Sequence, residues 1–158
     1  MKDRDILVAF DGSESALKAV DYVGSQFSGL SDIKVTLFYV IPSIPPQFWD
    51  DGHILARAER EERQRVIDRW LSNQRMVVAP LFEKASGMLT DKGMGPEQVE
   101  TKIRGDTTSV AEAILEEAKT GGYKTLVLGR QRTVPIFAGS LARTILHKGA
   151  GLTICIVE

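Results

Sequence analysis

The feature that most constrains the fold is a short apolar run, residues 6–10, which stops at Asp11 and Gly12. An aliphatic run of this length that is closed by a turn is typical of a strand buried on both faces. Ser13 follows as a candidate N-cap for a helix. Because a strand covered on both sides is characteristic of parallel sheets, this opening predicts an α/β protein.

The rest of the chain continues this alternation of strands and helices. The segment 99–103 reads as a strand that is more polar than the others, so we expect it at or near a sheet edge. A long helix is expected from about 54 to 91, and it should be broken or kinked near Pro80. A chain of 158 residues favours one domain, 1–158. We expect further strands at 35–41, 99–103, 125–128 and 152–157, and helices from 13 to about 28, from about 54 to 91, from the turn at 105–108 to 121–122, and from 139 to about 148.

Composition excludes several classes of protein. Twenty Lys and Arg against 21 Asp and Glu leave a formal charge of −1, so no global attraction to nucleic acid or anionic membrane is expected. Cys155 is the one cysteine and cannot form an intrachain disulfide or a cysteine-based zinc site. The first residues run directly into a strand pattern, and no apolar run approaches the roughly 20 residues that cross a bilayer. These features predict a cytoplasmic protein. His53 and His147 have no partners at metal-ligand spacing in the sequence, so no metal site is expected.

In an open parallel sheet, ligands bind beyond the carboxyl ends of the strands, where the strand order reverses. Asp11 follows the first strand, where its carboxylate can accept hydrogen bonds from a base or a ribose. The alternative is a turn or helix-capping aspartate, and the residues alone favour neither. Val40 ends the second strand at the same expected edge.

The stretch from Gly129 to Ser140 leaves a strand at a glycine and enters a helix at Gly139 and Ser140. Free backbone N–H groups at a helix start form a candidate anion site. Arg130 and Arg132 add guanidinium groups that can reach phosphate oxygens. An ordinary loop with a serine cap would have the same appearance. The sequence holds no other phosphate-loop or dinucleotide fingerprint.

The opening A-F-D-G-S-E-S-A, the later T-L-V-L-G-R and the G-S that opens a helix together resemble the universal stress protein family. The resemblance covers nearly the whole chain and is weakest from about 42 to 96. It implies a doubly wound five-stranded parallel sheet in the order 3-2-1-4-5 with helices on both faces. Asp11 would then lie beside Gly129. The family also implies a homodimer, commonly through the last strand, here residues 152–157.

Family members that bind ATP resemble one another in a loop of the form G-x2-G-x9-G-[ST]. Gly129 matches its first glycine, and Gly139 with Ser140 match its end. Arg132 stands in place of the second glycine, and six residues separate it from Gly139 where nine are expected. Either Arg130 and Arg132 replace backbone amides in an altered site, or the site is lost. The loss of glycine geometry favours weakened or absent ATP binding.

The resemblance thus implies a homodimeric binding or regulatory module of the stress response, with a degenerate adenine-nucleotide site. Asp11 and Val40 would face base and ribose, Gly129, Gly139 and Ser140 would face phosphates, and magnesium would enter only with a nucleotide. A slow ATPase or phosphotransferase at the same cleft is one alternative. Few local carboxylates are available for it, which favours binding over catalysis. A protein-interaction module acting through the charged helix at 54–91 is the other alternative.

Overall fold

The computed structural model describes residues 4–41, 56–105, 107, 109–130 and 140–158. They form a five-stranded sheet in the order β3-β2-β1-β4-β5, in which every neighbouring pair is parallel. The predicted strand order is therefore confirmed. The strands are β1 (Ile6–Ala9), β2 (Val35–Val40), β3 (Val99–Arg104), β4 (Thr125–Gly129) and β5 (Thr153–Val157).

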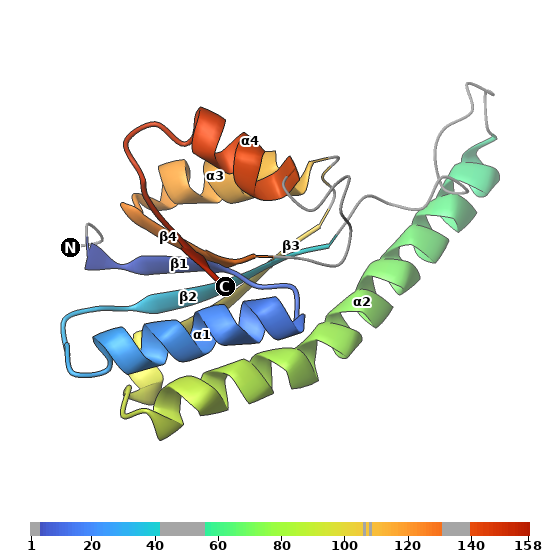
Figure 1. Cartoon of the computed structure of the whole chain (residues 1–158). Helices are drawn as coiled ribbons and strands as arrows, with labels where there is room; N and C mark the ends of the chain where they lie inside the picture. The colour runs from blue at the N-terminus through green and yellow to red at the C-terminus, as the bar shows by residue number, and fades with distance from the viewer. Residues whose placement is uncertain (1–3, 42–55, 106, 108, 131–139) are drawn as a thin grey trace.

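Helices cover both faces of this sheet, as Figure 1 shows. Helices α1 and α2 pack on one face, and α3 and α4 pack on the other. The doubly wound α/β class that the sequence predicts is confirmed. The helices are α1 (Glu14–Phe27), α2 (Arg57–Asp91), α3 (Val110–Gly121) and α4 (Ser140–Lys148), with a short 3-10 helix, η3 (Pro96–Gln98), before β3.

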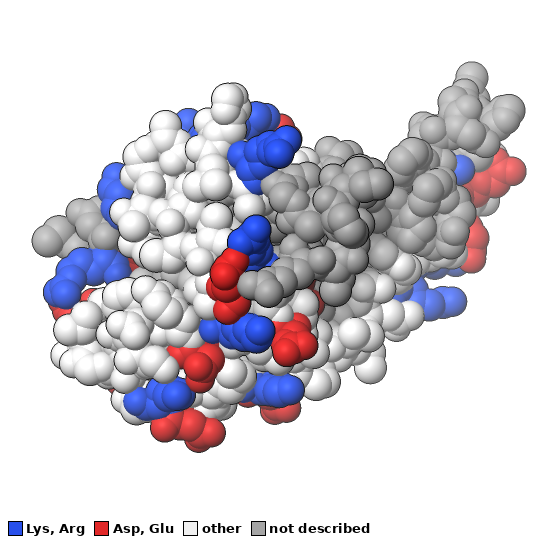
Figure 2. Space-filling view, viewed as in Figure 1, with Lys and Arg blue, Asp and Glu red and all other residues white. Residues whose placement is uncertain are grey.

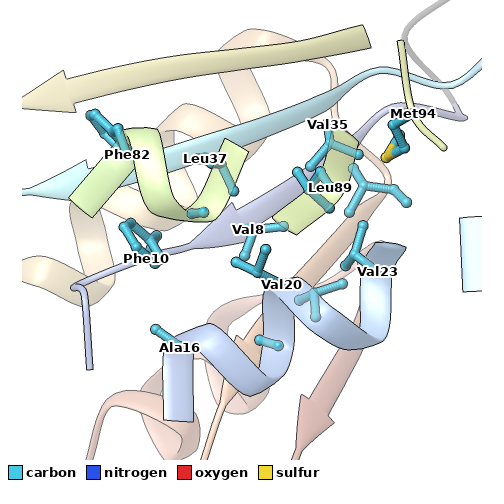
Figure 3. Close-up of a cluster of buried hydrophobic side chains, with 14 of the residues drawn as sticks. Val8, Phe10, Ala16, Val20, Val23, Val35, Leu37, Phe82, Leu89 and Met94 are labelled. Atoms are coloured by element: carbon cyan, nitrogen blue, oxygen red, sulfur yellow. The ribbon is translucent and has the colours of Figure 1, made fainter. Parts of the chain in front are cut away.

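The hydrophobic core is divided by the sheet into two layers. Val8 lies in the layer with α1 and α2, whose side chains converge in Figure 3. Its neighbour Leu7 lies in the layer with α3 and α4. Both side chains are fully buried, because successive residues of a strand point to opposite faces. This explains why the first strand is apolar at every position.

The two edge strands differ in character. The outer side chains of β3 are largely exposed and polar, so the predicted edge position of this strand is confirmed. At the opposite edge, β5 pairs only with β4 among the described strands. Its Ile156 is 38% exposed. An apolar edge strand of this kind offers unpaired backbone groups to another chain.

Helix α2 runs unbroken for 35 residues with Pro80 in its interior. Of the two outcomes expected near Pro80, the break is absent and the kink is present, as a bend between the two halves of the helix (Figure 1). A proline removes one backbone hydrogen bond and kinks a helix. Here Val78 and Phe82, on either side of the proline, are buried and hold the C-terminal half of α2 against the core, whereas residues 57–77 are exposed or half-buried. Among the described residues no helix, α2 included, is both long enough and apolar enough to cross a bilayer.

The starts of α1 and α3 are capped by serines. The Ser13 hydroxyl accepts a hydrogen bond from the backbone N–H of Ala16 at 3.2 Å, as the sequence predicts. The Ser109 hydroxyl accepts one from the N–H of Glu112 at 3.3 Å. In a parallel α/β fold these helix starts lie at the carboxyl edge of the sheet. The caps therefore fix the segments that surround a site at this edge.

Candidate functional site

A cavity of about 520 Å³ opens at the carboxyl edge of the sheet, where β1 lies between β2 and β4. This is the point at which the strand order reverses, and such points are the usual ligand sites of open α/β sheets. The volume lies within the range of small-molecule pockets, about 300–1,000 Å³. The cavity wall includes Asp11, Val40, Gly129 and Arg130. Segments more than 100 residues apart thus meet as the sequence predicts.

The other predicted site residues are described only in part or not at all. Gly139 and Arg132 lie outside the described residues, and so does the shortened loop between them. Ser140 is the first residue of α4, and nothing is described of its side chain. Gly105, which follows β3, lies against Leu71 and Ile41 rather than in the cavity wall.

The floor of the cavity is apolar. It is formed by Ala9 and Leu128 on the strands, by Val40 at the end of β2, and by Ile114 on α3. Val40 and Leu128 also belong to the buried core on the α3 and α4 side. The floor is therefore held in place by the packing of the sheet itself. A flat, weakly polar ring is the kind of group that such a surface accepts.

Polar groups also line the cavity, and four of them are not predicted from the sequence: Ser15, Tyr39, Ser109 and Thr144. Tyr39 is the one partly exposed residue of β2, and it reaches the cavity because β2 lies beside β1 in the folded sheet. Ser109 could have been found as the N-cap of the helix that follows β3. Burial, and then the charge of Asp11, raises the pKa of the Tyr39 phenol. The phenol is therefore un-ionised at neutral pH and can act as a hydrogen-bond donor.

Asp11 closes the turn between β1 and α1. Its carboxylate accepts a hydrogen bond from the backbone N–H of Ser13 at 2.9 Å. Gly12 between them has a φ of +77°, a conformation that glycine adopts without strain. Turn capping and a position in the cavity wall are therefore both properties of this residue. The turn orients the carboxylate at the rim.

Gly129 has a packing role that its sequence pattern did not reveal. A Cβ atom at this position would lie 2.1 Å from the carbonyl oxygen of Ser15 and 2.9 Å from the nitrogen of Ala16. The first turn of α1 therefore passes directly over the end of β4. Only a residue without a side chain allows this approach. The glycine thus shapes the cavity by bringing α1 and β4 together.

Arg130 contacts the end of β5 and the residue that follows this strand. Its backbone N–H donates to the carbonyl oxygen of Val157 at 2.8 Å. Its guanidinium forms an ion pair with Glu158. Among the described residues of the cavity wall, Arg130 is the one Lys, Arg or His. It is therefore the group there with which an anionic ligand would pair.

The described side chains provide groups for binding rather than a metal centre. No cluster of three or more His, Cys, Asp or Glu with metal-binding geometry occurs within the described residues. The described residues of the wall combine an apolar floor, serine, threonine and tyrosine hydroxyls, one carboxylate and one guanidinium. Acidic and basic side chains are interspersed on the face seen in Figure 2. This arrangement suits a small ligand with an apolar ring and polar substituents.

Fold and cavity together define a doubly wound α/β protein with a cavity at its switch point. The chain belongs to the universal stress protein family, whose sequence model matches residues 3–150. The resemblance found in the sequence is therefore confirmed. A search of curated proteins finds no significant match to the chain.

Solved structures with the same fold include several universal stress proteins. One from Burkholderia pseudomallei is 19% identical, with a TM-score of 0.64, covering 98% of this chain and 95% of that one. A structure from Archaeoglobus fulgidus in complex with dAMP is 18% identical, with a TM-score of 0.61 and full coverage of both chains (100% and 100%). A family protein from Arabidopsis thaliana with AMP bound is 18% identical, with a TM-score of 0.59, covering 97% and 90%.

Proposed function

We propose that the chain binds an adenine nucleotide in the cavity between β1 and β4 and acts as a binding module of the stress response. The observation that carries this proposal is the convergence of Asp11, Val40, Gly129 and Arg130 on one apolar-floored cavity at the switch point. Family membership and the AMP and dAMP bound by two relatives of the same fold support it. A cytoplasmic location stays a prediction.

We propose a position for each part of the ligand from the chemistry of the cavity wall. The adenine ring would lie on the apolar floor near Val40, and Asp11 would accept hydrogen bonds from the ribose or the base. The phosphate end would point toward Gly129 and Arg130 and the start of α4, where helix N–H groups favour an anion. Magnesium would enter only with the nucleotide. We propose AMP as the test ligand, because the sequence predicts weakened ATP binding.

Substituting Asp11 tests this placement. We expect Asp11→Ala to weaken AMP binding about 10- to 100-fold, since it removes a charged hydrogen-bond acceptor from the rim. Isothermal titration calorimetry measures the change. Because Asp11 also accepts from the N–H of Ser13, Asp11→Asn serves as a second variant that keeps an oxygen for the turn.

Asp32→Ala is the matched control. Asp32 is an exposed aspartate paired with Arg4, and it does not line the cavity. We expect its AMP affinity to equal that of the unaltered protein. Asp11→Asn should weaken AMP binding to an intermediate degree. If the unaltered protein shows no binding heat with AMP, or if both Asp11 variants bind AMP normally, the proposed site is wrong.

We further propose that the protein is a homodimer that pairs through β5. The observation that supports this is the apolar edge of that strand, with Ile156 at 38% exposure and Leu146 of α4 at 57%. Light scattering should give twice the 17.4 kDa mass of one chain. Ile156→Lys should yield monomers, because a charge on an edge strand opposes pairing.

Leu30→Lys offers a matched control for this test. Leu30 is equally exposed, at 38%, but lies between α1 and β2, away from β5. The Leu30 variant should remain dimeric. A monomeric unaltered protein at micromolar concentration, or equal dissociation by both lysine variants, would remove the proposal of pairing through β5.

A further inference from the structure

Arg130 lies between two hollows of the surface. Arg130 lines the cavity at the switch point, and it also lines a shallower depression between α4 and β5. Glu158 lines only the second of these. The ion pair between the two side chains therefore crosses the boundary of the ligand cavity.

In this ion pair the backbone of Arg130 is fixed, whereas the two charged side chains are exposed to solvent. The backbone of Arg130 is fixed by its hydrogen bond to Val157 at the end of β5. The side chains of Arg130 and Glu158 remain 59% and 56% exposed. Ion pairs that exposed are weak because water and salt screen them. An incoming anion can therefore exchange with the Glu158 carboxylate without disturbing the strand.

The charges of the wall make this exchange relevant to ligand choice. Asp11 is its one described carboxylate and Arg130 its one described cation. The phosphate of a nucleotide would pair with the Arg130 guanidinium, whereas a nucleoside carries no charge that requires this partner. A phosphate oxygen and the Glu158 carboxylate are both acceptors for the same guanidinium. The Glu158 carboxylate thus reduces the increase in binding affinity that a phosphate group gives to the ligand.

We propose that Glu158 competes with ligand phosphate for Arg130 and so determines how strongly the cavity distinguishes a nucleotide from its nucleoside. This inference rests on the proposed function, since it concerns the phosphate end of the same site. It identifies Glu158 as a specificity-determining residue that does not itself line the ligand cavity.

The test compares AMP with adenosine by calorimetry at low salt. We expect Glu158→Gln to bind AMP about 2- to 5-fold more tightly, the range that an exposed ion pair provides. Its affinity for adenosine should be unchanged. The gain for AMP should shrink as salt is added. In an Arg130→Gln background, the same change at Glu158 should alter AMP affinity little.

Glu62→Gln is the matched control, because Glu62 is 67% exposed, pairs with Arg65 and lies on α2 outside the cavity wall. It should leave both affinities unchanged. Equal AMP affinity in Glu158→Gln and the unaltered protein would overturn the inference. The inference would also be overturned if Glu158→Gln raised the affinity for adenosine as much as that for AMP, or if Glu62→Gln raised the AMP affinity equally. The same holds if Glu158→Gln raised the AMP affinity fully in the Arg130→Gln background. Absence of AMP binding in every variant would instead overturn the proposed function, and this inference with it.

Discussion

Gly129→Ala should destabilise the protein by about 1–3 kcal/mol or more. The added methyl group would lie 2.1 Å from the carbonyl oxygen of Ser15 and 2.3 Å from its carbonyl carbon. These are backbone atoms, so no rotamer change relieves the overlap, and α1 must move away from β4. Each kcal/mol lowers the melting temperature by about 2–4 °C for a chain of this size. Thermal unfolding followed by circular dichroism measures the loss.

Gly87→Ala is the control for this experiment. Gly87 lies inside α2 with nothing within 4 Å of the position that its Cβ would occupy. Alanine there should raise stability slightly, by about 0.5–1 kcal/mol, because glycine is unfavourable in a helix interior. A Gly129 variant as stable as the unaltered protein would show that α1 does not lie against β4 as described.

Phe82→Ala should have the largest effect on stability, about 3–5 kcal/mol. Phe82 is only 8% exposed and anchors α2 to the sheet. Its ring stacks on Phe10 with centroids 5.9 Å apart and meets Tyr39 edge to face at 6.4 Å. Removing the ring leaves a void beside Phe10, which follows β1, and beside Tyr39 of β2. Urea unfolding gives the free energy directly.

The same substitution should also weaken ligand binding, since Phe10 and Tyr39 line the cavity and would lose their support. Met76→Ala provides the comparison, because Met76 lies on the same helix at 73% exposure. It should change stability by no more than about 0.5 kcal/mol. Equal stability losses in the two variants would contradict the packing of α2 described here.

Much of the fold could be predicted from local patterns. The run at 6–10 indicates a strand buried on both faces, and Leu7 and Val8 indeed enter opposite core layers. Ser13 is predictable as a cap because capping depends on residues within one turn. Such interactions are local in the chain, so sequence periodicity records them.

Contacts between segments that are distant in the sequence could not be predicted from local patterns. The sequence leaves open a break or a kink near Pro80, and the buried residues Val78 and Phe82 beside the proline favour a continuous, bent helix. Tyr39 reaches the cavity only because β2 lies beside β1 in the folded sheet. The close approach of Ser15 explains why position 129 is a glycine, a reason different from the phosphate contact that its motif suggests.

The order of apolar runs, caps and glycines in the sequence by itself determined the class of fold and the edge of the sheet at which a ligand site would form. Tertiary structure alone decided that Arg130 is shared between the cavity and Glu158, and that α1 presses on the end of β4. The physical reason is range. Helix and strand periodicity arises from neighbouring residues, whereas charge pairing and close packing depend on distances that exist only after the chain has folded.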